Sequence, residues 1–193
     1  MRASTWMATL AFLFATPAIA QEPATFKAKA PELEERPAGD WINSKPLKLA
    51  ELHGRVVVLH FWTFGCSNCQ HNYPTLKAWQ KAFAKKGVTI IGVHTPELEQ
   101  ERDIRGVRQS AEKNGLTYPI VFDKDARTWK TWDNRWWPST YLIDKQGFVR
   151  YRWDGEFNWK KARGAAVMRQ KIEQLLAEPG PIEATTAVSP LAP

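Results

Sequence analysis

The chain has 193 residues, a formal net charge of +7 and an apolar fraction of 44%, with ten tryptophans and two cysteines. This length and apolar content suit one folded domain with a sizeable core, and they exclude a wholly disordered chain, which would have few aromatic and β-branched residues. Two cysteines exclude both a disulfide-rich scaffold and a zinc site built from four thiolates.

The first twenty residues have the pattern of a secretory signal peptide. Arg2 supplies the positive charge, an apolar stretch covers Trp6 to Ala15, and Ala18 to Ala20 form a small-x-small cleavage site. The apolar stretch is shorter than the ~20 residues of a membrane-spanning helix, which favours cleavage over an uncleaved anchor. We therefore expect residues 1–20 to be removed and the protein to be periplasmic or otherwise exported, where disulfides persist.

The rest of the chain is predicted to form one domain between two less regular segments. Residues 21–37 are rich in Pro, Ala and charge, and we interpret them as a linker or as an arm that becomes ordered by packing. The domain is expected over residues 38–178. Residues 179–193, rich in Pro, Ala and Thr, are expected to form a loose tail.

Strands and helices alternate in the first half of the predicted domain. Residues 38–54 are predicted to form a short strand pair and one helical turn. The run from Val56 to Trp62 is nearly all β-branched or aromatic, which indicates a strand buried on both faces of a parallel sheet. Apolar residues at spacings of three and four then predict a helix from Cys66 to Lys86, and a second buried strand follows at 88–93. This βαβ unit predicts an α/β fold.

The second half continues the alternation. The expected elements, in chain order, are a charged helix at 96–114, a strand at 119–122, a short helix at 126–132, hairpin strands at 140–143 and 148–151, and a last helix at 159–177. Gly115 is expected just beyond the end of the charged helix, and Gly147 at the hairpin turn.

Cys66 and Cys69 form a Cys-x-x-Cys motif at the start of the first predicted helix. Their spacing lets the two sulfurs face each other, and the unpaired N–H groups of the first helical turn stabilise a thiolate on Cys66. The thiolate is the form of cysteine that attacks a disulfide. Cys69 lies one turn inside the helix, where it is suited to resolving a mixed disulfide. Directly after a buried strand, the motif strongly indicates a redox site.

Three other uses of the cysteine pair fit the sequence less well. A structural disulfide across four residues closes a very small loop and therefore constrains the unfolded chain little. A zinc site would need ligands from His60, His71 or His94, because there is no second cysteine pair. Covalent haem attachment requires a histidine directly after the second cysteine, and Gln70 stands there.

Three stretches of the sequence together resemble the TlpA/ResA-like group of thioredoxin-fold proteins, and in particular its DipZ-like branch: Phe61 to Cys69, Ile91 to Glu97, and Trp137 to Asp144. The resemblance covers roughly residues 40–155. It implies a thioredoxin-like α/β fold with a central mixed β-sheet flanked by helices and an N-terminal extension. It also implies an extra helix inserted between Val93 and Tyr118.

The resemblance also implies roles for individual residues. Cys66 matches the nucleophilic cysteine and Cys69 the resolving one. Pro138 matches a cis-proline that faces the disulfide and would present the backbone of Trp137 to an extended substrate segment, and Pro74 matches a proline inside the active-site helix. The supporting residues expected around the cysteines are Trp62, Ser67, Asn68, Trp137 and His60.

Two positions depart from the pattern of this group. His60 stands where thioredoxin has a buried aspartate, and Asn72 stands where many members have an acidic residue, so both usual proton acceptors are missing. We hypothesise that His60 or a chain of water molecules accepts the proton of Cys69, because thiolate release needs a nearby base. The alternative is that His60 is a hydrogen-bonded histidine of the core.

The tryptophans and the basic residues bear on the choice of partner. Trp136 is expected at the surface beside the substrate, whereas Trp62, Trp79 and Trp129 are expected in the core. The basic residues are scattered, and neither a motif nor the expected compartment supports nucleic-acid binding.

The sequence therefore predicts an exported thiol–disulfide oxidoreductase that exchanges disulfides with protein substrates and needs no cofactor. The resemblance favours a reductant that receives electrons from a thiol protein, with a membrane involved only through a membrane-bound donor. The alternative is a non-catalytic metallochaperone that binds copper or zinc through Cys66, Cys69 and His71.

Overall fold

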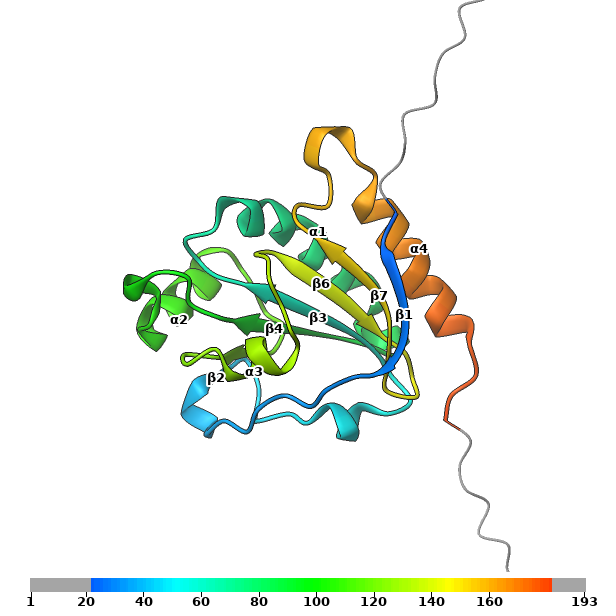
Figure 1. The fold of residues 1–193 in the computed structure, drawn as a ribbon, viewed down its shortest axis with the longest axis horizontal. Coiled ribbons are helices and arrows are strands. Elements are labelled where there is room, and N and C mark those ends of the chain that lie inside the picture. Colours follow the sequence, from blue (N-terminus) through cyan, green and yellow to red (C-terminus); the bar gives the residue numbers. More distant parts are fainter. Residues whose placement is uncertain (1–21, 182–193) are drawn as a thin grey trace, which may run out of the picture.

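A seven-stranded mixed sheet forms the centre of the computed structural model, which describes residues 22–181 (Figure 1). The expected signal peptide, residues 1–20, and most of the expected tail lie outside the described residues. Within residues 22–181, no helix has the length and apolar character needed to cross a membrane.

The strands follow one another across the sheet in the order β1-β7-β6-β3-β4-β5-β2. The strands are β1 (Ala24–Lys29), β2 (Trp41–Ile42), β3 (Val56–Trp62), β4 (Val88–His94), β5 (Ile120–Phe122), β6 (Ser139–Ile143) and β7 (Phe148–Asp154). The helices are α1 (Ser67–Phe83), α2 (Ile104–Lys113), α3 (Arg127–Thr131) and α4 (Gly164–Ala177). β4 runs parallel to both β3 and β5, and the other neighbours are antiparallel, which confirms the predicted α/β fold with a mixed sheet.

β3 is buried on both faces, as its β-branched and aromatic sequence predicts. Val58 and Trp62 belong to one core cluster, which they share with the buried sides of α1, α2 and α4. Leu59 and Phe61 face the other side, which the N-terminal segment and the residues around α3 cover (Figure 1). Each such side chain stabilises the fold by about 1.5–3 kcal/mol when it is fully buried. The strand that leads to the cysteines is therefore held by the core on both of its faces.

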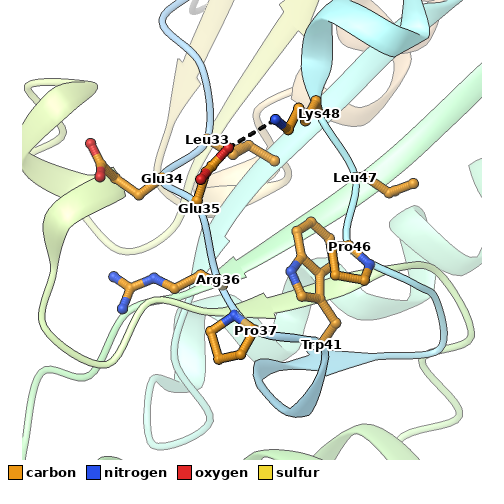
Figure 2. A pocket seen from close by; sticks show the side chains of 9 residues that line it. All are labelled: Leu33, Glu34, Glu35, Arg36, Pro37, Trp41, Pro46, Leu47 and Lys48. Atoms are coloured by element: carbon orange, nitrogen blue, oxygen red, sulfur yellow. Dashed lines mark hydrogen bonds and ion pairs between the residues drawn. The ribbon is translucent and has the colours of Figure 1, made fainter.

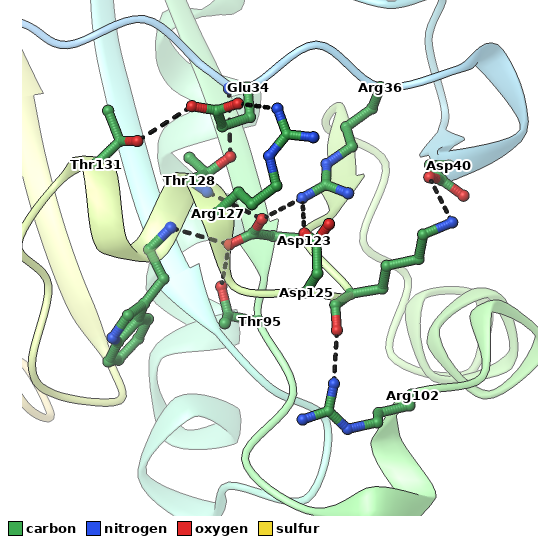
Figure 3. A network of polar contacts seen from close by, with 12 residues as sticks. Glu34, Arg36, Asp40, Thr95, Arg102, Asp123, Asp125, Arg127, Thr128 and Thr131 are labelled. Carbon is green, nitrogen blue, oxygen red and sulfur yellow. Dashed lines mark hydrogen bonds and ion pairs between the residues drawn. The ribbon is translucent and has the colours of Figure 1, made fainter.

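Residues 22–37 are an ordered arm, the second of the two interpretations of this segment. β1 pairs antiparallel with β7 at the edge of the sheet, although all six of its residues are exposed. Further along the arm, Arg36 donates to the buried carboxylate of Asp123 at 2.7 Å, and Glu34 pairs with Arg127 (Figure 3). The sequence pattern did not predict this strand, because an exposed edge strand needs no alternation of apolar and polar residues.

The segment 38–54 contains one strand, so the predicted strand pair was wrong. β2 pairs with β5, nearly eighty residues further along the chain, and no local pattern shows such a pairing. The predicted helical turn is present as a 3₁₀ turn at Leu49–Leu52. Beside it, a cleft of about 370 Å³ lies between the arm and residues 46–48, where Lys48 pairs with Glu35 at 2.8 Å (Figure 2).

Two predicted helices begin later than expected. The charged helix starts at Ile104 as α2, where the carboxylate of Asp103 accepts the N–H of Arg105 as an N-cap, and a 3₁₀ turn precedes it at Glu99–Glu101. The last helix starts at Gly164 as α4. Trp159–Lys161 form a separate 3₁₀ turn, because Lys160 and Lys161 adopt left-handed backbone angles that interrupt a helix.

Candidate active site

Cys66 and Cys69 form a disulfide at the N-terminus of α1. Cys66 is the N-cap residue, and its sulfur accepts a hydrogen bond from the backbone N–H of Cys69 at 3.1 Å. Cys66 is half-buried and Cys69 is fully buried, while Ser67 and Asn68 between them are exposed. An incoming sulfur can therefore reach only Cys66.

A cleft of about 450 Å³ opens at Cys66. The residues that line it are Gly65, Cys66, Ser67, Asn68, Glu97, Arg135, Trp136 and Trp137. Trp136 is 61% exposed, as predicted. The peptide bond between Trp137 and Pro138 is cis, in agreement with what the resemblance implies. The structure thus brings together four of the expected residues, Cys66, Ser67, Asn68 and Trp137, around one opening.

A chain of contacts fixes the indole of Trp137 at the edge of this cleft. Its ring stacks on Trp129, with 3.9 Å between the ring centroids, and its Nε1–H donates to the backbone oxygen of Thr95 at 3.0 Å. The hydroxyl of Thr95 donates to Asp123 at 3.1 Å, and Asp123 also accepts from Arg36 (Figure 3). The N-terminal arm is therefore connected to the cleft through polar contacts that are buried at Asp123 and partly buried at Trp137.

The loop that leads into Cys66, residues 63–65, is held by the carboxylate of Glu101. Glu101 is 1% exposed and accepts the backbone N–H of Gly65 at 2.9 Å, of Glu97 at 2.7 Å and of Leu98 at 2.9 Å. Burial raises the pKa of Glu101, but the hydrogen bonds from these N–H groups outweigh it, so the pKa lies below its usual value. A negative charge therefore lies one residue before the reactive cysteine.

His94, at the end of β4, holds the same loop from a second side. Its Nε2 atom accepts the backbone N–H of Phe64 at 3.3 Å and lies 3.3 Å from the hydroxyl of Thr63. The ring also stacks on Phe64, with 5.4 Å between the centroids. Burial lowers the pKa of His94 to about 4, although the charge of Glu101 opposes this shift, so the imidazole is neutral at pH 7.

His60 and Trp62 lie under α1 in the core and do not line the cleft. The Nδ1 atom of His60 is 3.0 Å from the hydroxyl of Thr140, and its Nε2 atom has no hydrogen-bond partner among the described residues. Burial lowers the pKa of His60 to about 3. By strand alternation, His60 shares its face of β3 with Val58 and Trp62, in the cluster that contains Cys69. His60 is thus a hydrogen-bonded core histidine on the side of the buried cysteine.

Asn72 has a structural use that an acidic residue could not fulfil. Its amide nitrogen donates to the backbone oxygen of Gly155 at 3.2 Å, while its oxygen accepts the N–H of Phe157 at 2.9 Å. Asn72 is 1% exposed, and a carboxylate lacks the donor for the first of these bonds. The departure from the family pattern therefore ties α1 to the segment after β7.

The ligand set expected for a metallochaperone is not assembled in the structure. His71 is exposed, and its Nδ1 atom pairs with Glu156 at 2.8 Å. Within residues 22–181, no group of three or more His, Cys, Asp or Glu side chains is placed to hold a metal ion. The histidine instead joins α1 to the segment after β7.

The sequence interpretation missed three residues beside the cysteines: Glu101, His94 as a loop anchor, and Trp159. In the sequence, Glu101 is one of several charged residues in a predicted solvent-exposed helix. Its hydrogen bond with Gly65 joins residues that are 36 positions apart. No local signal could have found this contact, because Pro96 is as compatible with the first turn of a helix as with a loop.

Comparison with known proteins defines the family. The model of the AhpC/TSA family matches residues 24–152. The chain belongs to the AhpC/TSA family. It is 39% identical over 145 residues to protein DipZ of Mycobacterium tuberculosis, which is 72% of this chain and 20% of DipZ. It is 32% identical over 103 residues to the thiol-disulfide oxidoreductase ResA of Geobacillus kaustophilus, which is 53% of this chain and 56% of ResA.

These relatives confirm the resemblance to the ResA-like and DipZ proteins. The chain spans about a fifth of the length of DipZ. A solved thioredoxin-like superfamily protein matches with a TM-score of 0.70 and 28% identity, over 80% of this chain and 99% of the other. The thioredoxin-like fold is therefore shown.

Proposed function

We propose that the protein is an exported thiol–disulfide oxidoreductase that reduces disulfide bonds in other proteins. The observation that carries this proposal is the placement of the Cys66–Cys69 disulfide, with one sulfur in an open cleft and the other buried behind it. The similarity to the thiol-disulfide oxidoreductase ResA supports it. The signal pattern of residues 1–20 supports export.

The reaction begins from the reduced protein. The thiolate of Cys66 attacks one sulfur of a substrate disulfide, a Cys66–substrate bond forms, and the substrate S–S bond breaks. The released substrate thiolate takes a proton from solvent. Cys69 then gives up its proton and attacks the sulfur of Cys66, which closes the disulfide seen here and releases the second substrate thiol. The substrate gains two electrons, which a dithiol protein then restores to the Cys66–Cys69 pair.

His60 is proposed to position a chain of water molecules that accepts the proton of Cys69, because a pKa of about 3 makes its own imidazole too weak a base. It lies on the face of β3 that packs in the cluster with Cys69, and its Nε2 atom, which has no partner among the described residues, is available to bind such a water. The rate of disulfide reduction by His60→Ala, measured against pH, tests this role. We expect slower closure of the Cys66–Cys69 disulfide at neutral pH, and an unchanged pH profile would remove His60 from the mechanism.

The carboxylate of Glu101 supports the direction of the reaction. A negative charge next to Cys66 destabilises its thiolate, which makes the reduced form less stable relative to the disulfide. A less stable reduced form gives up its electrons more readily. The pair is therefore proposed to act as a reductant.

Insulin reduction and equilibration with glutathione test the proposed function together. The reduced protein should accelerate insulin reduction, whereas Cys66→Ser should not. Its equilibrium potential should lie near the reducing end of the range of about −270 to −120 mV that such folds cover. Acceleration of thiol oxidation instead, with a potential near −120 mV, would overturn the reductant assignment.

A further inference from the structure

Exposed large apolar side chains gather around the Cys66 end of the molecule. Among residues 22–181, the exposed large hydrophobic side chains are Phe26, Leu98, Trp136 and Trp159. Trp136 lines the cleft at Cys66, and Leu98 follows Glu97, which lines the same cleft. Trp159 is 55% exposed and lines a second cleft. Exposed apolar groups that gather around one reactive group indicate an interaction surface.

The second cleft adjoins the first at Asn68. It has a volume of about 190 Å³ and is lined by Asn68, Asp154, Gly155, Glu156 and Trp159. Asn68 also lines the cleft at Cys66, so the two clefts meet on an exposed residue between the two cysteines. A polypeptide that crosses this point has Trp136 on one side and Trp159 on the other.

The segment that carries Trp159, called here the Trp159 loop (residues 155–163), has a fixed base. The N–H of Gly155 donates to the backbone oxygen of Pro138 at 2.7 Å, which joins the loop to the edge of the cleft at Cys66. Phe157 is fully buried, and its backbone oxygen accepts the N–H of Gly164 at 2.8 Å, which closes the loop. The exposed indole is therefore presented from a rigid support.

The charges of the second cleft are already paired within the protein. Glu156 pairs with His71 at 2.8 Å, and Asp154 pairs with Arg152 at 2.7 Å. Neither carboxylate is left to select a charged partner. The indole of Trp159 is thus the main group that the cleft offers, and it favours an apolar side chain.

We propose that Trp136 and Trp159 form a clamp for an extended polypeptide segment whose cysteine is flanked by bulky apolar residues, such as occurs in an unfolded or partly folded protein. This inference rests on the proposed function and names the substrate class of the same site. Bulky apolar residues are mostly buried in folded proteins, so an extended segment that presents several of them beside a cysteine is typical of an open chain. Rigid tryptophans at the centre of an interface are the residues that most often dominate binding.

Kinetics with matched peptides tests the clamp. Two peptide disulfides of equal length are compared, one with Leu and Phe around the cysteine and one with Ser and Gly, together with hydroxyethyl disulfide as a small substrate. The wild type should show a KM about tenfold lower for the apolar peptide than for the polar one. Trp159→Ala and Trp136→Ala should each raise the KM for the apolar peptide several-fold. Trp159→Ala should leave the rate with hydroxyethyl disulfide unchanged, because Trp159 does not line the cleft at Cys66.

Phe26→Ala is the matched control, because Phe26 is an exposed large apolar residue that lines neither cleft. It should leave all three substrates unaffected. Equal KM values for the two peptides, or an equal loss with peptides and hydroxyethyl disulfide in Trp159→Ala, would overturn the clamp. Equal KM values for the two peptides are the result expected if the true substrate is a folded protein.

A binding measurement separates the clamp from the proposed function. Cys66→Ser cannot perform exchange, and calorimetry on this variant measures the affinity for the reduced forms of the same peptides. If Cys66→Ser binds the apolar peptide more tightly than the polar one, and this preference is lost when Trp159→Ala is added, the clamp is supported even if the protein reduces no disulfide. A fully active reductase that shows no preference would refute the clamp alone.

Discussion

Two loops flank Cys66, and they are held in different ways. Residues 63–65 precede the cysteine and are bound by buried side chains, the carboxylate of Glu101 and the imidazole of His94. The Trp159 loop lies on the other side of the motif, and its contacts to α1 include the ring of Phe157 on Trp79, the amide of Asn72 and the exposed pair of His71 with Glu156.

The difference separates chemistry from recognition. Residues 63–65 set the position of the reactive sulfur, and the side chains that hold them are a charged carboxylate and a neutral imidazole. Substitution of either side chain should therefore change both the stability of the fold and the pKa of the Cys66 thiol. The second loop presents an exposed indole from a fixed base, and its outer contacts can change without a change at the sulfur. The three predictions below test this separation in order of decreasing effect.

The largest effect is expected for Glu101→Ala. The substitution leaves three N–H groups without their acceptor, and each unsatisfied buried donor costs about 1–3 kcal/mol. We expect the free energy of unfolding to fall by at least about 2 kcal/mol and the pKa of the Cys66 thiol to fall, because a neighbouring negative charge is removed. Denaturant unfolding and the pH dependence of alkylation measure the two changes.

Glu97→Ala is the control for this variant, because Glu97 is a nearby carboxylate that is exposed. It should change the free energy of unfolding by less than about 0.5 kcal/mol. If Glu101→Ala leaves the thiol pKa where it is in the wild type, the carboxylate serves the fold alone and does not set the redox direction.

Acid should weaken the fold through the buried histidines. The folded-state pKa of His94 is about 4, below the value of about 6.5 in an unfolded chain, so only the unfolded state binds the proton between these values. Stability that is present above pH 6.5 is therefore lost as the pH falls towards 4. The expected contribution of His94 is up to about 1.4 kcal/mol for each pH unit in this window.

His94→Gln should reduce the dependence of unfolding free energy on pH between 6.5 and 4, since the amide does not titrate, and the contribution of His60 should remain. His53→Gln is the matched control, because it makes the same substitution at an exposed position. Equal slopes for the wild type and His94→Gln would show that His94 titrates normally in the folded protein.

The smallest effect is expected for His71→Ala. The pair of His71 with Glu156 involves an imidazole that is 60% exposed, and exposed pairs contribute about 0–1 kcal/mol. Unfolding free energy should fall by less than about 1 kcal/mol, with the rate on hydroxyethyl disulfide unchanged. A loss as large as that of Glu101→Ala would mean that the two loops are held alike.

Local patterns were enough to predict the parts of the fold that are determined locally. β3, α1 and the hairpin of β6 and β7 follow from apolar periodicity and a glycine turn, and the Cys-x-x-Cys motif needs only its place after a buried strand. The strand β1 was missed because its residues are exposed and its partner is β7. A strand pairing across more than a hundred residues cannot be predicted from the pattern of a short sequence segment.

The supporting residues of the site were harder to predict because their roles depend on distant partners. Asn72 binds backbone groups of Gly155 and Phe157, which lie 83 and 85 residues away. Trp159 was placed at the start of a helix, and only the left-handed residues after it show that it belongs to a separate loop. In both cases the sequence shows the residue type, but the contacts that give the residue its role are formed only when distant segments fold together.

Trapping of a mixed disulfide tests the central claim most directly. Reduced Cys69→Ser and reduced Cys66→Ser are each incubated with a peptide disulfide, and the adducts are located by mass spectrometry. We predict a stable adduct on Cys66 in the Cys69→Ser variant and almost none on Cys69 in the Cys66→Ser variant, because only Cys66 is accessible in the cleft. Equal adducts on both cysteines, or none on either, would contradict the assignment of Cys66 as the attacking thiol.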